Sequence, residues 1–186
     1  MTKECAWSLH HPLERDYHDS EWGVPVYDDR ILFEFITLEG AQAGLSWLTV
    51  LKRRDAYRQA FVDYQLEQIV DFDEQDIERI MTDYDVIKHR KKLQSVVSNA
   101  QAALTLQREW GSLSHALWQF VDHQPIVNHW TTACQVPTAT PESKAMSVFL
   151  KKAGFRFVGE TICYAFMQAM GMVNDHLVSC PCRKKS

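Results

Sequence analysis

Four residues of the chain could together bind a metal ion. Cys5 and His18 lie near its beginning, with twelve residues between them, and His176 and Cys180 lie near its end. Because His176 and Cys180 are four positions apart, a helical turn would place both on one face. Two thiols and two imidazoles are the ligand set of a closed tetrahedral zinc site, which would join the two ends of the chain. The spacing alone leaves a second interpretation open, in which these are ordinary, unrelated residues.

A second group combines aromatic rings with one carboxylate. Trp7, Tyr17, Trp22 and Trp47 lie within the first fifty residues, and Glu39 lies among small and apolar neighbours in LEGAQAGLSW. A carboxylate is costly to bury unless it is paired or hydrogen-bonded. The group therefore suits a pocket that stacks a flat, electron-poor ring and binds its N–H edge. The alternative is that the tryptophans fill the core.

The basic residues are clustered although the net charge is only −4. Clusters occur at residues 52–54, 88–92, 151–156 and 183–185. Such clusters are usually solvated helix faces, but several of them on one surface would form a stripe that binds phosphates.

The elements that must position these groups are helical. Apolar residues recur at helical spacing behind capping residues, and no segment alternates with period two for long enough to predict a strand. We therefore expect an all-α fold, with a long surface loop between residues 122 and 141. The predicted helices cover residues 28–38, 46–61, 73–81, 90–108, 112–120, 141–153 and 161–170.

The connection TDYDVIKH links two of these helices and leads into a basic one. Its backbone N–H groups and the start of the next helix could bind a phosphate, with Lys88, Arg90 and Lys91 beside them. It lacks the glycines that usually allow close approach, so an ordinary helical turn with solvated charges is the alternative.

Composition indicates one domain or two small lobes with a shared core, since 46% of the residues are apolar. Five cysteines without an early apolar segment predict reduced thiols and a cytoplasmic location. The apolar runs are too short to span a bilayer, so no membrane partner is expected.

Several long motifs carry a resemblance to a known family. These are CAW, YHDSEWGVP, LEGAQAGLSWLTVLKRR, FVGETICYAFMQAMGMVNDH and the trailing Cys180. Across essentially the whole chain they resemble the bacterial 3-methyladenine DNA glycosylase I family of the helix-hairpin-helix superfamily. The resemblance implies a single domain over residues 1–186, with the helix-hairpin-helix element at about 73–108. It also implies one structural zinc per chain that joins segments 1–22 and 174–182, with Cys5, His18, His176 and Cys180 as its ligands.

The resemblance implies a monofunctional DNA-repair enzyme. Such an enzyme flips 3-methyladenine out of double-stranded alkylated DNA, hydrolyses its N-glycosidic bond, and leaves an abasic site and the free base. By resemblance Glu39, Tyr17 and Trp47 recognise the base, with Trp7 and Trp22 nearby. We expect the chain to act as a monomer.

The sequence also suggests how the chemistry is divided. N3-methylation gives the base a positive charge and makes it a better leaving group, so selective binding could supply much of the rate. Residues 90–108 contain no Asp or Glu, whereas related glycosylases place a catalytic aspartate just beyond the hairpin. We therefore expect Glu39 to act first in recognition and second as a catalytic electrostatic group. Leu45 could insert into the space left by the flipped base, or it could be a core leucine.

Three other classes of protein fit these residues less well. A zinc-dependent hydrolase needs an open metal position, and no HExxH motif occurs. A DNA-binding module without catalysis has little use for a buried Glu39, and a non-DNA interaction protein leaves the clustered pocket residues unexplained. The sequence departs from the family pattern at Glu14, since family members often have an aromatic residue at this position.

Overall fold

The computed structural model describes residues 5–185, most of which lie in helices joined by short connections. The all-α prediction is confirmed apart from two very short strands. The α-helices of the described range are α1 (Pro12–Ser20), α2 (Asp29–Gln42), α3 (Trp47–Leu51), α4 (Arg54–Ala60), α5 (Leu66–Ile69), α6 (Glu74–Asp83), α7 (Arg90–Trp110), α8 (Leu113–Trp118), α9 (Pro141–Ala153) and α10 (Glu160–Ala169). Short 3-10 turns cover Ala6–Leu9, Val62–Tyr64, Gln119–Val121, Ala133–Gln135 and Pro181–Lys185.

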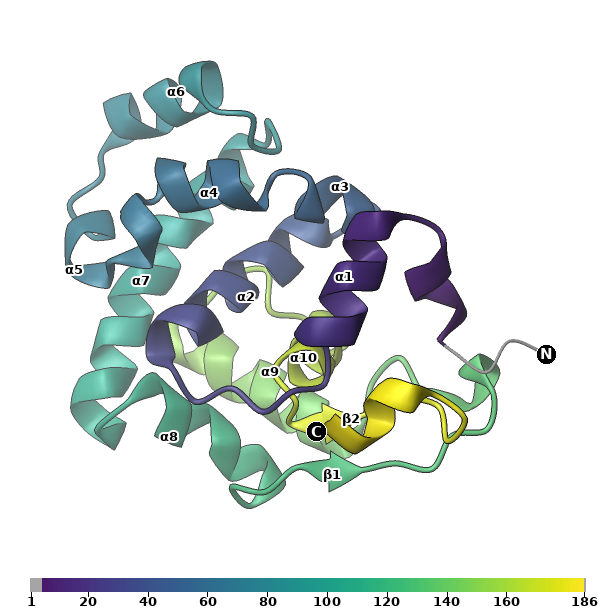
Figure 1. Ribbon diagram of the computed structural model, residues 1–186. Helices are drawn as coiled ribbons and strands as arrows, with labels where there is room; N and C mark the ends of the chain where they lie inside the picture. Colours follow the sequence, from purple (N-terminus) through teal and green to yellow (C-terminus); the bar gives the residue numbers. More distant parts are fainter. Residues whose placement is uncertain (1–4, 186) are drawn as a thin grey trace.

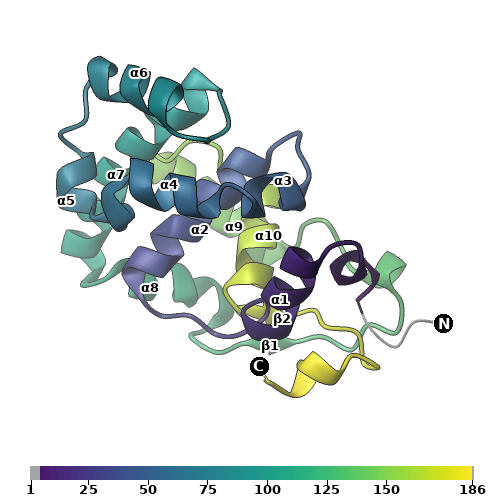
Figure 2. The same cartoon turned by 45° about the horizontal axis from the view of Figure 1, so that its top comes forward.

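Helix α2 runs through the middle of the molecule. Figures 1 and 2 show α4 to α7 on one side of it, and α1, α10 and both ends of the described chain on the other. Its first turn is capped by Asp28, whose side chain accepts hydrogen bonds from the N–H groups of Arg30 and Ile31. Ten of its fourteen residues are buried, Glu39 among them. Since both faces of α2 are covered, Glu39 must point into the interior or into a cavity.

Helices α6 and α7 follow one another across residues 84–89, as the sequence predicts. Asp73 and Asp76 form a capping box at the start of α6. His89 caps α7, and Gly111, in the left-handed region at φ 84°, ends it. The two helices are also joined by salt bridges from Arg90 to acidic side chains of α6.

The predicted helix over residues 46–61 is wrong in one respect, because the chain turns between α3 and α4. Arg54 explains the turn. Its guanidinium donates to Glu34 Oε1 and to Glu21 Oε1, both at 2.8 Å, and lies 4.9 Å from the centre of the Phe35 ring. These tertiary contacts outweigh the local preference for one continuous helix.

The predicted loop between residues 122 and 141 contains a strand that the sequence did not indicate. Strand β1 (Ile126–Val127) pairs in parallel with β2 (Val173–Asn174). Two residues are too few to show an alternating pattern, so the pairing is visible only in the fold. It places the segment that follows β1 beside the C-terminal part of the chain.

The two ends of the described chain lie side by side (Figures 1 and 2). At this junction Gly23 has φ +79°, and a Cβ added there would lie 3.1 Å from the ring of His176. Only glycine combines that conformation with so close an approach. Across residues 5–185, no helix is both long and apolar enough to span a membrane.

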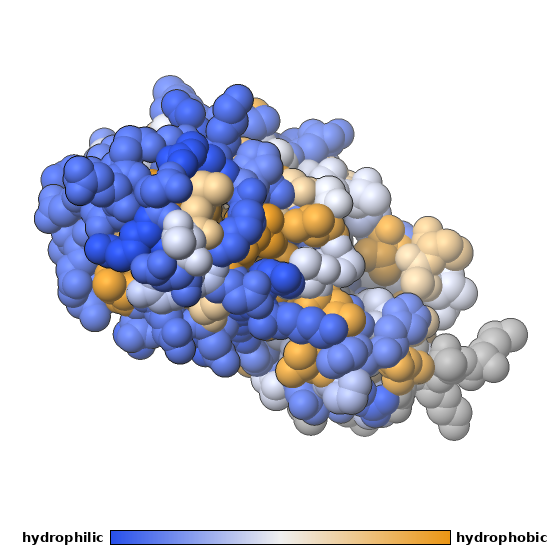
Figure 3. Space-filling model, turned by 90° about the horizontal axis from the view of Figure 1, so that it is seen from above, coloured by the Kyte–Doolittle hydropathy of each residue, from blue (hydrophilic) through white to orange (hydrophobic). Residues whose placement is uncertain are grey.

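Seen from above, the surface divides into two parts (Figure 3). Hydrophilic residues cover most of the part formed by α4 to α7. Apolar residues gather toward the middle and right of this view, on the side where α1 and α3 lie.

Candidate functional site

A cavity of about 410 Å³ opens between α1, α2, α3 and α10. Aromatic, apolar and acidic side chains line it together. The lining residues are Cys5, Ala6, Trp7, Glu14, Tyr17, Trp22, Glu39, Gln42, Trp47, Ala133, Val136, Ala165, Gln168, Asp175 and Leu177. All five residues that the sequence predicts for base binding are among them. A cavity of this size accommodates a small planar ligand.

Glu39 is the acid that the last turn of α2 presents to the cavity. Its side chain is only 4% exposed, and none of the hydrogen bonds among residues 5–185 reaches its carboxyl group. Burial raises the pKa of this carboxyl from its usual range to about 8. A buried acid without a partner is costly, so the site is suited to a ligand that offers a donor or a positive charge.

Two further polar atoms in the wall have no partner in the described part of the chain. These are the hydroxyl of Tyr17 and the indole Nε1 of Trp47, both buried. The two rings lie with centroids 5.4 Å apart and planes tilted by 50°. Burial, and then the nearby Glu39, raise the pKa of Tyr17 well above its usual value, so its hydroxyl stays protonated as a donor. A ligand with acceptor and donor atoms on its edge would satisfy all three groups.

Trp7 and Trp22 form the wall that the cavity shares with the chain ends. Their ring centroids are 5.2 Å apart at an angle of 76°. Trp22 also lies 4.7 Å from the ring of His176, and Trp7 lies 5.4 Å from that of His18. The two tryptophans therefore contact the predicted metal ligands as well as the cavity.

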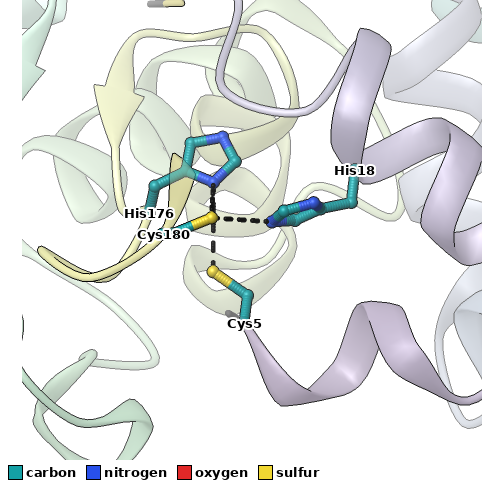
Figure 4. Close-up of side chains that lie close together, drawn as sticks. All are labelled: Cys5, His18, His176 and Cys180. Carbon is teal, nitrogen blue, oxygen red and sulfur yellow. Dashed lines mark hydrogen bonds between the residues drawn. The ribbon is translucent and has the colours of Figure 1, made fainter. Parts of the chain in front are cut away.

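The four predicted metal ligands converge at this junction (Figure 4). Their ligand atoms all lie within 4.8 Å of one another, and all four residues are buried. Cys180 Sγ lies 3.5 Å from His18 Nε2 and 3.5 Å from His176 Nδ1, and Cys5 Sγ lies 3.9 Å from His176 Nδ1. This group could hold a metal ion.

In each histidine, the ring nitrogen that faces away from the cluster has a hydrogen-bond partner. His18 Nδ1 lies 2.8 Å from Asp19 Oδ1, and His176 Nε2 lies 3.0 Å from the carbonyl oxygen of Trp22. Such partners fix the orientation of a metal-binding imidazole. Burial lowers the pKa of His176 to about 4, so its ring is neutral at pH 7, as metal binding requires.

The local structure of the C-terminal pair differs from the prediction. His176 lies in an irregular segment and Cys180 ends the turn that follows it, which is closed by a hydrogen bond from Cys180 N to the carbonyl of Leu177; neither residue is on a helix. The structure also separates Cys180 from its neighbour Cys182. Cys182 Sγ lies 3.4 Å from Asp19 Oδ1, outside the group of four.

The cavity contains acids and amides that the sequence did not single out. Asp175 accepts hydrogen bonds from Trp130 Nε1 (2.7 Å), Asn128 Nδ2 (2.7 Å), Tyr164 Oη (2.5 Å) and Gln168 Nε2 (2.8 Å). These bonds hold the segment after β1 against α10. The only sequence signal for Asp175 was its place beside His176.

Glu14, the residue that departs from the family pattern, also lines the cavity. It is 8% exposed, on the first turn of α1. Together with Glu39 and Asp175 it makes three acids in the cavity lining. The cavity is therefore suited to a positively charged ligand.

The four residues predicted to contact DNA lie away from the cavity lining. Leu45 is 41% exposed in the short α2–α3 connection, so it is not a core leucine. Lys91 is exposed, and Lys88 Nζ donates to the carbonyl of Tyr84 at the start of the connection between α6 and α7. Arg90 is engaged by Glu74 and Glu78.

The chain is similar to proteins of known activity along nearly its whole length. The family model described as methyladenine glycosylase matches residues 7–184. DNA-3-methyladenine glycosylase 1 of Escherichia coli (strain K12) is 48% identical over 180 residues, which are 97% of this chain and 96% of that protein. DNA-3-methyladenine glycosylase of Haemophilus influenzae is 49% identical over 183 residues, which are 98% of this chain and 99% of that protein.

The fold is similar to a solved structure as well. That structure concerns 3-methyladenine recognition by 3-methyladenine DNA glycosylase I from Staphylococcus aureus. It superposes with a TM-score of 0.94 at 38% identity and covers 97% of this chain and 96% of that one.

Proposed function

Because the chain belongs to the methyladenine glycosylase family and removes 3-methyladenine from alkylated DNA in base-excision repair, we propose that the aromatic cavity binds the flipped base. One observation carries this proposal. Glu39, the Tyr17 hydroxyl and Trp47 Nε1 are buried polar groups without partners in the described chain, and all three residues line one cavity.

In this proposal the Trp47 ring stacks on the base, and Glu39 accepts hydrogen bonds from its amino edge. Tyr17, whose ring is tilted against Trp47, orients the base within the cavity. Base–aromatic stacking contributes about 1 to 3 kcal/mol, and a cation–π term adds to it when the base carries the methyl-derived charge. Neutral adenine lacks that term, so the cavity distinguishes the lesion by charge.

The raised pKa of Glu39 sharpens this discrimination. In the empty cavity a carboxyl with a pKa of about 8 is mostly protonated at pH 7. A cationic base next to it favours the ionised form, so binding of the cation releases the carboxyl proton. A neutral base gives no such compensation, and the buried negative charge would then remain costly.

In this proposal the hydrolysis proceeds without a covalent enzyme intermediate. The bond between the base nitrogen and C1′ of the sugar breaks, and its electron pair neutralises the cationic base. A water molecule adds its oxygen to C1′ and releases one proton to the solvent, which leaves an abasic site. The Glu39 carboxylate stabilises the positive charge that moves onto the sugar as the bond breaks.

We also propose that the cluster of Cys5, His18, His176 and Cys180 binds one zinc ion. Tetrahedral zinc with these ligands places a sulfur and a nitrogen atom roughly 3.6 Å apart. Three sulfur–nitrogen pairs of this cluster lie 3.5 to 3.9 Å apart, and all four ligand atoms lie within 4.8 Å of one another. Four protein ligands leave no open position for an activated water, so the ion would join the chain ends and perform no hydrolysis.

DNA contact is assigned to the surface of the hairpin and to the α2–α3 connection. Lys88 and Lys91 would bind phosphates beside the N-terminus of α7, and Leu45 would fill the gap left by the flipped base. Arg90 would first have to exchange its partners Glu74 and Glu78 for a phosphate. We propose that a single copy of the chain acts on double-stranded DNA in the cytoplasm.

The experiment that tests the cavity is base release from methylated DNA by the Glu39→Gln variant. Glutamine keeps the shape of the side chain but cannot carry its charge. We expect at least about a hundredfold lower rate of 3-methyladenine release, in the range for loss of one preorganised electrostatic group. Quenching of tryptophan fluorescence by free 3-methyladenine should weaken in the same variant.

Glu67→Gln is the matched control, since Glu67 is exposed on α5 and distant in sequence from every lining residue. It should release the base at the rate of the unmodified protein. A Glu39→Gln variant with normal base release and normal quenching would show that the base binds elsewhere.

A further inference from the structure

Lys92 is a buried lysine that the proposed chemistry does not use. It lies in the first turn of α7 and is 9% exposed. Its Nζ donates to the carbonyl oxygens of Ala41 (2.9 Å) and Ala43 (2.7 Å), and no acidic side chain of residues 5–185 forms a salt bridge with it. Its amino group therefore serves two backbone carbonyls of another element.

The positive charge of Lys92 is unfavourable for α7 and favourable for α2. A positive charge in the first turn of α7 opposes the dipole of its own helix. The same charge lies against the last carbonyls of α2, where a helix is negative and its carbonyls lack partners within the helix. Burial also lowers the pKa of Lys92. An apolar side chain would leave the carbonyls of Ala41 and Ala43 without this donor, so the buried lysine is explained by the backbone that it holds in place.

The two carbonyls flank the end of α2 and begin the connection to α3. Glu39 lies two residues before Ala41, and Trp47 begins α3 four residues after Ala43. The four residues between the helices, 43–46, are all exposed. A Cβ added at Gly44 would meet nothing within 4 Å, so the tip of the connection stands free of other parts of the described chain. Leu45 is at this tip.

The same face of α7 holds a second loop in a similar way. Asn99 lies two turns beyond Lys92 and is 3% exposed. Its side chain donates to the carbonyl of Arg156 (3.1 Å) and accepts from the N–H of the same residue (2.8 Å). Two buried polar side chains on one helix face thus bind the backbone of two separate loops, which makes loop anchoring a role of this face of α7.

We propose that Lys92 is a positioning residue that couples the hairpin to the α2–α3 connection. The connection before α7 is the part of the hairpin proposed to contact DNA. When it does so, Lys92 holds the α2–α3 connection in a fixed position relative to the hairpin, and thereby fixes where Leu45 meets the duplex. The proposal rests on the proposed function of the cavity. It assigns to Lys92 no contact with DNA or with the base, since its ammonium is buried and it is not among the lining residues of the cavity.

The test is the Lys92→Met variant, which keeps the volume of the side chain and removes both hydrogen bonds. We expect the single-turnover rate of base release from methylated duplex DNA to fall about fivefold to tenfold, no more than on truncation of Leu45 itself, because Lys92 acts by placing that tip. The dissociation constant for free 3-methyladenine should stay within twofold. The dependence of duplex affinity on salt should keep its slope, because no phosphate contact is lost.

Lys144→Met is the matched control for the loss of one positive charge. Lys144 is exposed on α9, a helix that contains neither loop, and its variant should leave all three measurements unchanged. If Lys92→Met does not fold, Lys92→Gln keeps one amide donor for the carbonyls and should show the same pattern with a smaller loss of rate.

Three results would overturn the inference. One is normal base release from the duplex in Lys92→Met or Lys92→Gln. Another is a salt slope reduced by about one charge, which would make Lys92 a phosphate ligand. The third is an equal loss of free-base binding and duplex activity, which would make it a general support of the cavity. If the unmodified protein fails to bind free 3-methyladenine, the proposed function of the cavity fails, independently of the result for Lys92.

Discussion

The aromatic cavity and the metal cluster share the wall formed by Trp7 and Trp22, but they differ in whether their key polar groups have hydrogen-bond partners. In the cluster, the outward nitrogen of each histidine is bound, His18 to Asp19 and His176 to the carbonyl of Trp22. In the cavity, the carboxyl of Glu39 and the donors of Tyr17 and Trp47 have no partner in the described chain.

This difference matches two kinds of ligand. A site whose outer contacts are complete holds its ligand atoms in one geometry, which suits an ion that stays bound. A site with unsatisfied groups gains most when a matching molecule enters and loses that gain when it leaves. The cluster is therefore suited to a permanent structural ion, and the cavity to a base that is bound and released.

Loss of one metal ligand should have the largest effect on the molecule. We expect His176→Ala to lose the bound metal, at least about 3 kcal/mol of the free energy of unfolding, and base release together, because metal binding contributes directly to folding. Metal content, chemical unfolding and base release measure the three effects. A variant that is folded, metal-loaded and inactive would contradict a purely structural role.

Cys180 and Cys182 give a finer version of this test. Cys180→Ser should lose the metal as His176→Ala does, whereas Cys182→Ser should keep it, since Cys182 lies outside the group of four. Metal loss in Cys182→Ser alone would move the site to the neighbouring thiol.

Local signals in the sequence predicted most of the helices and their ends. Asp28, Asp73 and Thr140 cap their helices as expected, and Gly154 ends α9 in the left-handed region. These signals succeed because a cap and the N–H groups that it binds lie within four residues of each other. The geometry that decides them is therefore contained in the sequence itself.

Contacts between distant residues were harder to predict. The break between α3 and α4 depends on Arg54 meeting Glu34, twenty residues away. Asp175 and Val136 enter the cavity only because β1 pairs with β2, which brings together segments that are remote in the chain. Spacing alone left the metal ligands as one of two interpretations. The resemblance favoured the metal site, and the fold brought the four residues together.

Removal of the Trp47 ring tests whether the cavity binds its ligand by stacking. We expect Trp47→Ala to weaken binding of free 3-methyladenine by about 1 to 3 kcal/mol while the metal stays bound. Trp110→Ala is the control, because Trp110 ends α7 and does not line the cavity. Equal affinities of the two variants would argue against stacking by Trp47.

The pH dependence of stability tests the burial of Glu39 in the cavity. The pKa of Glu39 is about 8 in the folded protein and near 4.5 when unfolded, so the folded state binds its proton more tightly. Stability from this group is full below pH 4.5 and is lost as the pH rises through 8. Relative to the unmodified protein, Glu39→Gln should gain about 2 kcal/mol between pH 6 and pH 8. Chemical unfolding at both values measures this difference, and an unchanged difference would show that the carboxyl is not buried as an acid.

Truncation of the exposed tip of the α2–α3 connection should have the smallest effect and the most selective one. Leu45 is 41% exposed and contributes little to the core, so Leu45→Ala should keep the stability and the metal of the unmodified protein. If Leu45 fills the space that the base leaves in the duplex, base release from duplex DNA should fall about tenfold, since an inserted side chain offsets the cost of unstacking. Binding of free 3-methyladenine should not change, because no duplex has to be opened. A stable Leu45→Ala variant with normal duplex activity would show that Leu45 does not fill the gap left by the flipped base. Another residue of the segment 43–46 would then have to fill it.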